Sequence, residues 1–181
     1  MSVLKSELPL DYPRWLVEEL RSDHAGEVGA VTIYQGILAV SRDTSVREFA
    51  RHHLQTEKKH LADINALLPA AQRSRLLPLW RIAGFLTGAL PALFGAKAVY
   101  ATIQAVETFV DHHYAAQIER LDAEQIFPAL RAVLHQCRLD EVAHRDEAKS
   151  NLVSTPGSAL KLWCKAVGSG SAFAVSLAKR F

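Results

Sequence analysis

The sequence predicts an all-α protein: a four-helix bundle with a long apolar crossover segment and an additional C-terminal helix. Three observations lead to this prediction. Capping residues and prolines divide the chain into long helical segments. No alternating apolar run indicates a strand. Glutamate and histidine side chains recur in two similar halves, as expected when a helix–loop–helix unit is used twice around a long crossover.

Composition agrees with one globular domain over residues 1–181. The chain is 49% hydrophobic and 22% charged, which argues against disorder. The net charge is +2 and no long basic block is present, so we expect no nucleic-acid partner. Cys137 and Cys164 provide no disulfide framework. The N-terminal MSVLKSELPLDYPRW lacks the apolar core of a secretory signal, so we expect reduced thiols in a cytosolic compartment.

The first third of the chain predicts an irregular arm and two helices. The arm covers residues 1–12, and the first helix begins at about Pro13 or Leu20 and ends near Val40. Ser45 and Glu48, in the segment 45–48, match a capping box at the start of the second helix, which ends near residue 68 before a proline.

The apolar segment 79–95 contains IAGFLTGALPALFGA and separates the two halves. Because Gly84, Gly88 and Pro91 interrupt it, we predict a short, kinked crossover element. It is shorter than the roughly 20 residues that span a bilayer. Packing in a core and lying on a membrane surface are both compatible with its composition.

Three further helices follow the crossover. We expect the third bundle helix over about 96–121 and the fourth from Pro128, which suits the first turn of a helix, to about Val153. A C-terminal apolar helix is expected over 156–179, because Thr155 followed by Pro156 marks its start.

Two copies of a Glu-x-x-His pattern mark the second and fourth bundle helices. Glu57 and His60 lie in TEKKH, and Glu141 and His144 lie in RLDEVAHRD. A separation of three residues places both side chains on one helix face. A carboxylate and an imidazole placed in this way can bind one metal ion from the same side.

Two further glutamates lie in apolar stretches of the first and third bundle helices. Glu27 is in HAGEVGAVTIY and Glu107 is in IQAVETFV. A buried, unpaired carboxylate is costly, and metal binding offsets this cost. The order Glu, Glu-x-x-His, Glu, Glu-x-x-His is the ligand inventory of the two-metal site in ferritin-like bundles. The predicted metal ligands, which also act in catalysis through the metals, are Glu27, Glu57, His60, Glu107, Glu141 and His144.

Neighbouring residues supply the expected surroundings of this site. Tyr114 follows Glu107 by seven residues, as Tyr34 follows Glu27, so each tyrosine shares a helix face with a glutamate. His113 and Tyr114 are candidates to support the ligands. Asp140 is placed to accept a hydrogen bond from a ligating imidazole across the bundle, whereas Thr56 occupies the corresponding place in the other half. Cys137 is expected to be an inert core residue. Carboxylates and imidazoles suit iron or manganese.

Five stretches carry a resemblance to a known family: DHAGEVGA, EKKH, LPLWRIAGFLTGAL, AVETFVDHHYAAQI and RLDEVAH. From about Leu20 to its end the chain resembles the demethoxyubiquinone hydroxylases of ubiquinone biosynthesis, and all six predicted ligands match. The resemblance implies a ferritin-like di-iron monooxygenase that hydroxylates the ring of a polyprenylated demethoxy-benzoquinol. It implies two iron ions alternating between Fe2+ and Fe3+, O2 as co-substrate, and NADH or another reductant.

The substrate's isoprenoid tail implies contact with a membrane. The segments 79–95 and 156–179 would then form a monotopic membrane surface. No mitochondrial import sequence is visible, which favours a bacterial member on the cytoplasmic face of the inner membrane. An accessory lipid-binding protein and a homo-oligomer remain open.

Three alternatives use the same residues differently. A ferritin-like iron store or ferroxidase needs a polar, cage-forming exterior, which the apolar crossover disfavours. A di-iron peroxidase often carries paired cysteines, which are absent here. A non-catalytic quinone- or lipid-binding bundle would use the acids only as structure, and failure to bind about two irons would favour it.

Overall fold

The computed structural model describes residues 12–181, so the predicted arm over 1–12 lies almost wholly outside the described residues. The described part consists of helices and contains no strand, which confirms the all-α prediction. The elements in chain order are α2 (Arg14–Val40), α3 (Thr44–Leu67), the short 3-10 helix η1 (Ala70–Gln72), α4 (Leu77–Ala92), α5 (Ala96–Glu124), α6 (Pro128–Ser150) and α7 (Ser158–Arg180).

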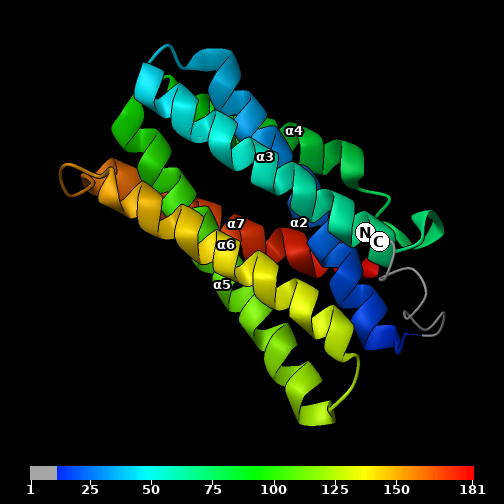
Figure 1. Cartoon of the computed structure of the whole chain (residues 1–181). Coiled ribbons are helices and arrows are strands. Elements are labelled where there is room, and N and C mark those ends of the chain that lie inside the picture. Colours follow the sequence, from blue (N-terminus) through cyan, green and yellow to red (C-terminus); the bar gives the residue numbers. More distant parts are fainter. Residues whose placement is uncertain (1–11) are drawn as a thin grey trace.

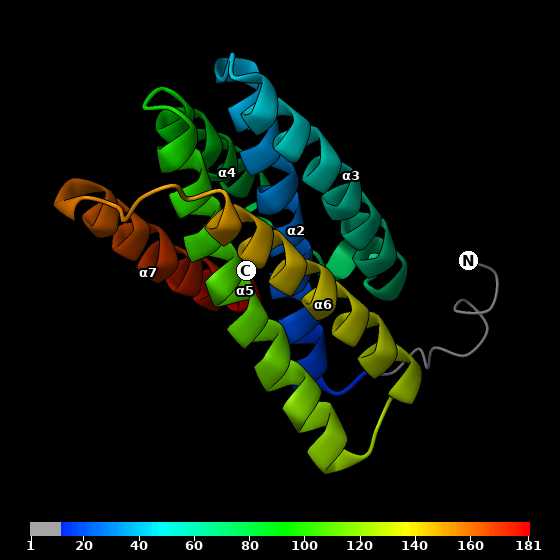
Figure 2. The same ribbon diagram turned by 60° about the vertical axis from the view of Figure 1, so that its left-hand side comes forward.

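Four helices form the bundle. α2 packs against α3, α5 packs against α6, and α3 meets α6 across the bundle. The long axes of these helices share one direction in Figures 1 and 2. α4 covers α2 and leads into α5, while α7 returns across α5 and α2. The predicted bundle with a crossover and an additional C-terminal helix is therefore confirmed.

The start of α3 differs from the predicted capping box. Asp43, not Ser45, is the capping residue: its Oδ1 accepts hydrogen bonds from the backbone N–H of Ser45 at 2.9 Å and of Val46 at 3.2 Å. An aspartate in this position satisfies two of the free N–H groups at the helix start. The prediction placed the capping residue two positions too late.

The glycines do not break the crossover segment, because α4 is one uninterrupted helix. Its glycines serve close packing. A Cβ at Gly84 would collide with the backbone of Gly29, and a Cβ at Gly88 would collide with the backbone of Ile33. Pro91 lies in the last turn of α4, and the chain then turns at Gly95, whose φ is 93°. Because glycine has no side chain, Gly84 and Gly88 allow α2 and α4 to pack closely, and they do not end the helix.

Each bundle helix carries two apolar segments separated by a polar centre. In α2, Leu16 and Leu20 belong to one core cluster, Ile33 and Ile37 belong to the other, and Glu27 lies between them. α3, α5 and α6 repeat this arrangement around their own glutamates. The two apolar cores therefore hold a belt of polar side chains in the middle of the bundle.

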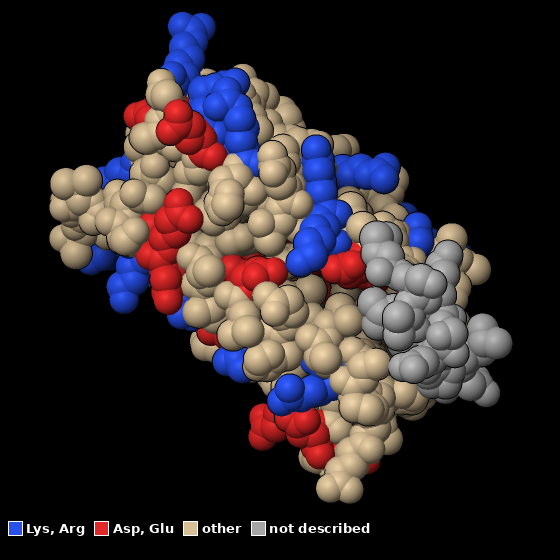
Figure 3. All heavy atoms as spheres, viewed as in Figure 1, with Lys and Arg blue, Asp and Glu red and all other residues tan. Residues whose placement is uncertain are grey.

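The outer face of α4 is apolar and exposed. Ile82 is 60% exposed on it, and Phe94, just beyond the end of the helix, is 82% exposed. On the face in Figure 3, charges of both signs are interspersed. None of the helices within residues 12–181 is long and apolar enough to span a membrane.

Candidate metal centre

The structure brings all six predicted ligands together between the two apolar cores. Each of them is at most 3% exposed. Their donor atoms form two overlapping groups, in each of which one atom per residue lies within 4.8 Å of the others. Glu57 and Glu141 belong to both groups. The groups are Glu27, Glu57, His60 and Glu141, and Glu57, Glu107, Glu141 and His144.

Both imidazoles direct the same ring nitrogen toward the carboxylates. His60 Nδ1 lies 3.1 Å from Glu141 Oε1 and 3.8 Å from Glu27 Oε2. His144 Nδ1 lies 3.0 Å from Glu57 Oε1 and 3.2 Å from Glu141 Oε2. The three-residue spacing within α3 and α6 thus delivers each glutamate and histidine to one centre.

Two buried tyrosines hold the outer glutamates, each from the other half of the chain. Tyr114 donates a hydrogen bond to Glu27 Oε1 at 2.5 Å, and Tyr34 donates one to Glu107 Oε1 at 3.2 Å. Tyr34 was not predicted as a site residue. Its seven-residue spacing from Glu27 indicated the correct helix face, but its partner lies on α5.

The hydrogen bond expected for Asp140 is present. Asp140 Oδ2 lies 3.0 Å from His60 Nε2, on the side of the ring that points away from the carboxylates. Cys137 is buried in the apolar cluster, where burial raises the pKa of its thiol. Asp140 therefore supports a predicted ligand, and Cys137 lies in the core.

His113 does not contact the six residues. Its Nε2 lies 3.0 Å from Asp23 Oδ1, and Gln117 Nε2 donates to the same oxygen at 2.7 Å. Sequence reasoning missed this buried acid, although it belongs to the DHAGE stretch. It also missed His53, whose ring centroid lies 4.0 Å from that of His144. Both lie on the ligand face of their helices, Asp23 four residues before Glu27 and His53 seven residues before His60, so their spacing could have indicated them.

Burial and mutual repulsion perturb the carboxylates. Burial raises the pKa of Glu27 to about 7 and those of Glu57 and Glu107 well above the ordinary value, and the charge of Glu141 adds to each shift. Burial also favours neutral Glu141, but the imidazoles of His144 and His60 outweigh it and lower the pKa of Glu141 to about 2. The same carboxylates raise the pKa of His60 to about 10 against the effect of burial.

Several of these buried atoms have no hydrogen-bond partner. Nδ1 of His144 lies within ion-pair distance of Glu57 and Glu141. Nevertheless this nitrogen, both carboxylate oxygens of Glu57 and one oxygen each of Glu27 and Glu141 make no hydrogen bond of acceptable geometry. Such atoms cost free energy unless a ligand meets them. They converge from four helices as carboxylate and imidazole donors, which is the ligand set of a carboxylate-bridged pair of metal ions. The residues therefore fit a two-metal centre.

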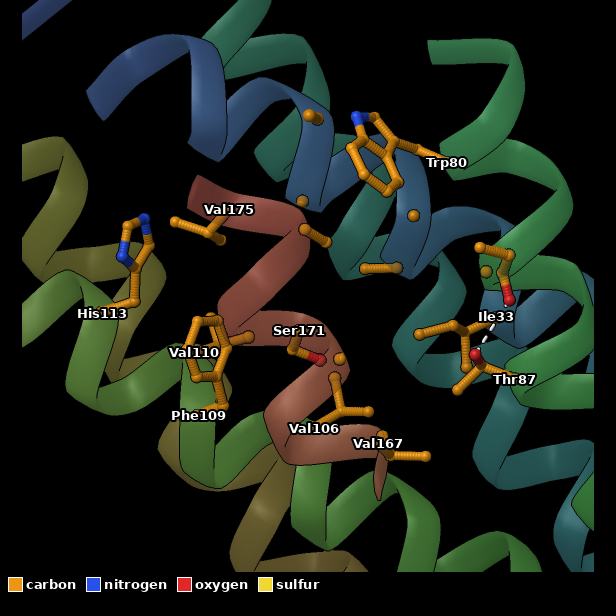
Figure 4. A pocket seen from close by; sticks show the side chains of 18 of the residues that line it. Ile33, Trp80, Thr87, Val106, Phe109, Val110, His113, Val167, Ser171 and Val175 are labelled. Atoms are coloured by element: carbon orange, nitrogen blue, oxygen red, sulfur yellow. Dashed lines mark hydrogen bonds between the residues drawn. The ribbon is translucent and has the colours of Figure 1, made fainter. Parts of the chain in front are cut away.

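A cavity of about 380 Å³ leads to this centre between α2, α4, α5 and α7. Glu27, Glu107 and Glu141 line it at its buried end, and the exposed residues Ala83 of α4 and Gly170 of α7 line it toward the surface. Its walls are mainly apolar, with Val106 and Val110 of α5 facing Val167 and Val175 of α7 (Figure 4). The site is thus open to an apolar molecule from the side of α4 and α7.

Comparison with known proteins agrees with this architecture. The family described as "Ubiquinone biosynthesis protein COQ7" matches residues 14–178. A 3-demethoxyubiquinol 3-hydroxylase of Rhodospirillum rubrum is 43% identical over 136 residues, which cover 73% of this chain and 63% of that protein. A mitochondrial NADPH-dependent 3-demethoxyubiquinone 3-hydroxylase of Rattus norvegicus is 37% identical over 167 residues, 90% of this chain and 76% of that protein. With its polar centre inside the bundle and this match over nearly its whole described length, the chain belongs to the COQ7 family of ubiquinone biosynthesis proteins.

Proposed function

We propose that this protein is a di-iron hydroxylase that adds a hydroxyl group to the ring of a polyprenylated demethoxy-benzoquinol, as a 3-demethoxyubiquinol 3-hydroxylase. The observation that carries the proposal is the set of unsatisfied, buried carboxylate and imidazole atoms that face one another inside the bundle. The names of the curated relatives supply the substrate class. Membership of the family and the donor set thus support the same chemistry.

Six residues would hold the two iron ions. Glu57 and Glu141 belong to both donor groups and would contribute to holding both ions. Glu27 with His60, and Glu107 with His144, would complete the two positions. Iron bound here would activate O2 for attack on an electron-rich ring. The hydrogen bonds from Tyr114 and Tyr34 would hold the two outer carboxylates in place.

The overall reaction fixes what else is needed. One atom of O2 replaces a ring hydrogen as a hydroxyl group, and the other leaves as water, which requires two electrons and two protons. An external two-electron reductant must supply the electrons. The nicotinamide named for the rat relative is the first candidate.

The cavity is the proposed site of the quinol ring. Its volume of about 380 Å³ lies within the range of small-molecule pockets and its walls are mainly apolar, which suits a substituted benzoquinol. The ring would lie at the end lined by Glu27 and Glu107, and the isoprenoid tail would leave between Ala83 and Gly170. The exposed apolar face of α4 borders this exit and would lie on the membrane that holds the tail.

An iron count joined to a turnover assay tests the proposal. Metal-free protein is loaded with Fe2+ without oxygen, and O2, NADPH and a short-tailed demethoxyubiquinol are then added. We expect about two irons per chain and a product heavier by one oxygen atom. Glu141→Ala should lose both, whereas Asp146→Ala, an exposed acid on the same helix, should retain both. Two bound irons without product would exclude this substrate, and failure to bind iron would refute the metal centre itself.

A further inference from the structure

The two metal positions differ in the hydrogen-bond partner of the histidine ring nitrogen that faces away from the centre. We infer that they are inequivalent: the position at His60 fills first and holds its ion more tightly, because Asp140 anchors His60, whereas no carboxylate among residues 12–181 hydrogen-bonds to Nε2 of His144. The inference rests on the proposed metal centre and adds an order of filling to it. Asp140 acts here through His60 and is a positioning residue.

The surroundings of His60 fix one tautomer. Nε2 lies 3.0 Å from Asp140 Oδ2, and the acid is itself held by Gln136, which donates to Oδ1 at 2.9 Å. Metal binding would displace the proton from Nδ1, which faces Glu141 and Glu27, while the proton on Nε2 stays shared with Asp140. A carboxylate behind an imidazole also makes it a stronger donor.

His144 lacks this support. Its Nδ1 faces Glu57 and Glu141 in the same way, but no side chain within residues 12–181 accepts a hydrogen bond from its Nε2. The ring of His53 packs against it instead, with centroids 4.0 Å apart. The tautomer of His144 is therefore not fixed by an anion.

The six ligands and the two tyrosines that hold the outer glutamates are mirrored between the halves. The matching pairs are Glu27 with Glu107, Tyr114 with Tyr34, Glu57 with Glu141 and His60 with His144. The residue immediately before the bridging glutamate breaks the symmetry: it is Asp140 in α6 and Thr56 in α3. Loss of a partner of this kind typically lowers metal affinity about 10- to 100-fold.

Stepwise zinc binding, followed by nuclear magnetic resonance of 15N-labelled histidine, tests the order of filling. His60→Gln and His144→Gln assign the two imidazoles in the metal-free protein. At one equivalent of Zn2+ we expect the His60 signal to move to its ligated position while that of His144 stays. Equal partial shifts of both signals, or movement of His144 first, would overturn the inference.

Substitutions then test the cause. Asp140→Asn should weaken binding of the first zinc ion about 10- to 100-fold in competition with a chelator. Asp146→Asn removes the same charge from an exposed place on α6 and should not. Thr56→Asp supplies the acid that the first half lacks, and it should reduce the difference in affinity between the first and the second zinc ion. If both asparagine variants lost the same zinc affinity, the change in net charge would explain the effect, and the role assigned to Asp140 would be overturned.

The outcomes separate this inference from the proposed function. If the protein binds neither zinc nor iron, both the inference and the proposed function are refuted. A protein that binds two zinc ions with equal affinity keeps the proposed two-metal centre and loses only the order of filling. Circular dichroism of each variant shows whether the helices are intact, and Thr56→Asp provides a result even where Asp140→Asn unfolds.

Discussion

At the scale of single residues, the buried ionisable side chains of the metal-free centre make the stability of the fold depend on pH. Glu27, Glu57 and Glu107 keep protons in the folded protein at a pH where the unfolded chain has lost them. A carboxyl group with a raised folded pKa loses its stabilising contribution as pH rises through that pKa. His60, whose pKa is raised to about 10, acts in the same direction above about pH 6.5. The metal-free protein should therefore lose stability as pH rises from about 6.5 to about 8.

Urea unfolding in the presence of a chelator measures this slope. Each proton held only by the folded state changes the free energy of unfolding by about 1.4 kcal/mol per pH unit. Glu107→Gln removes one such group and should reduce the slope by up to this amount. Glu119→Gln, an exposed position on the same helix, should leave it unchanged. A metal-free protein that becomes more stable over this interval would contradict the prediction.

At the scale of the helices, glycines determine how α4 sits on α2. Gly88→Ala would drive a methyl group into the backbone of Ile33, so we expect a loss of about 1–3 kcal/mol in the free energy of unfolding. Gly168→Ala in α7 meets nothing within 4 Å and should stabilise by up to about 1 kcal/mol. Denaturant unfolding of both variants checks the pair. Equal, small effects would mean that the contact between α2 and α4 yields readily.

α7 closes one side of the cavity, and two of its glycines allow a matched test. Gly170 lines the cavity and Gly168 does not, while a side chain at either position meets open space. Gly170→Leu should fill the passage and lower turnover of the short-tailed quinol roughly 10-fold or more, equivalent to about 1.4 kcal/mol. Gly168→Leu should leave turnover near the original rate, and both variants should retain their iron. Equal rates in the two variants would place the substrate path elsewhere.

At the scale of the whole molecule, the exposed apolar face of α4 distinguishes one side of the protein. Ile82, at 60% exposure, is flanked there by Leu79 and Leu86. We expect the protein to sediment with neutral liposomes, because apolar burial in the lipid interface needs no lipid charge. Ile82→Glu should weaken this binding strongly. Leu139→Glu, on α6 with 49% exposure, should not. Binding that persists in Ile82→Glu and fails in Leu139→Glu would assign the membrane surface to α6.

The two helices of the second half, α5 and α6, are also tied to each other by a largely buried carboxylate. Asp111 of α5 accepts hydrogen bonds from Arg138 at 2.7 Å and from Arg145 at 2.6 Å, both on α6. These contacts lie on either side of the level of Glu141 along α6. They therefore hold the two helices in register at the centre, where the donor atoms must converge.

The sequence by itself determined the helices, their order and the six residues that meet at the centre. The reason is local: three-residue and seven-residue spacings fix which side chains share a helix face. Whether the six bind metal stays a prediction. The sequence also pointed to Asp140, because its place beside Glu141 is part of the same local pattern.

Only the tertiary structure decided which faces meet. It paired Tyr34 with Glu107 and Tyr114 with Glu27, and it turned His113 toward Asp23. It also revealed Gly88 as a packing residue, where the sequence alone indicated a break. Contacts across a bundle depend on how helices are rotated and how closely they approach, and spacing along a single helix contains neither quantity.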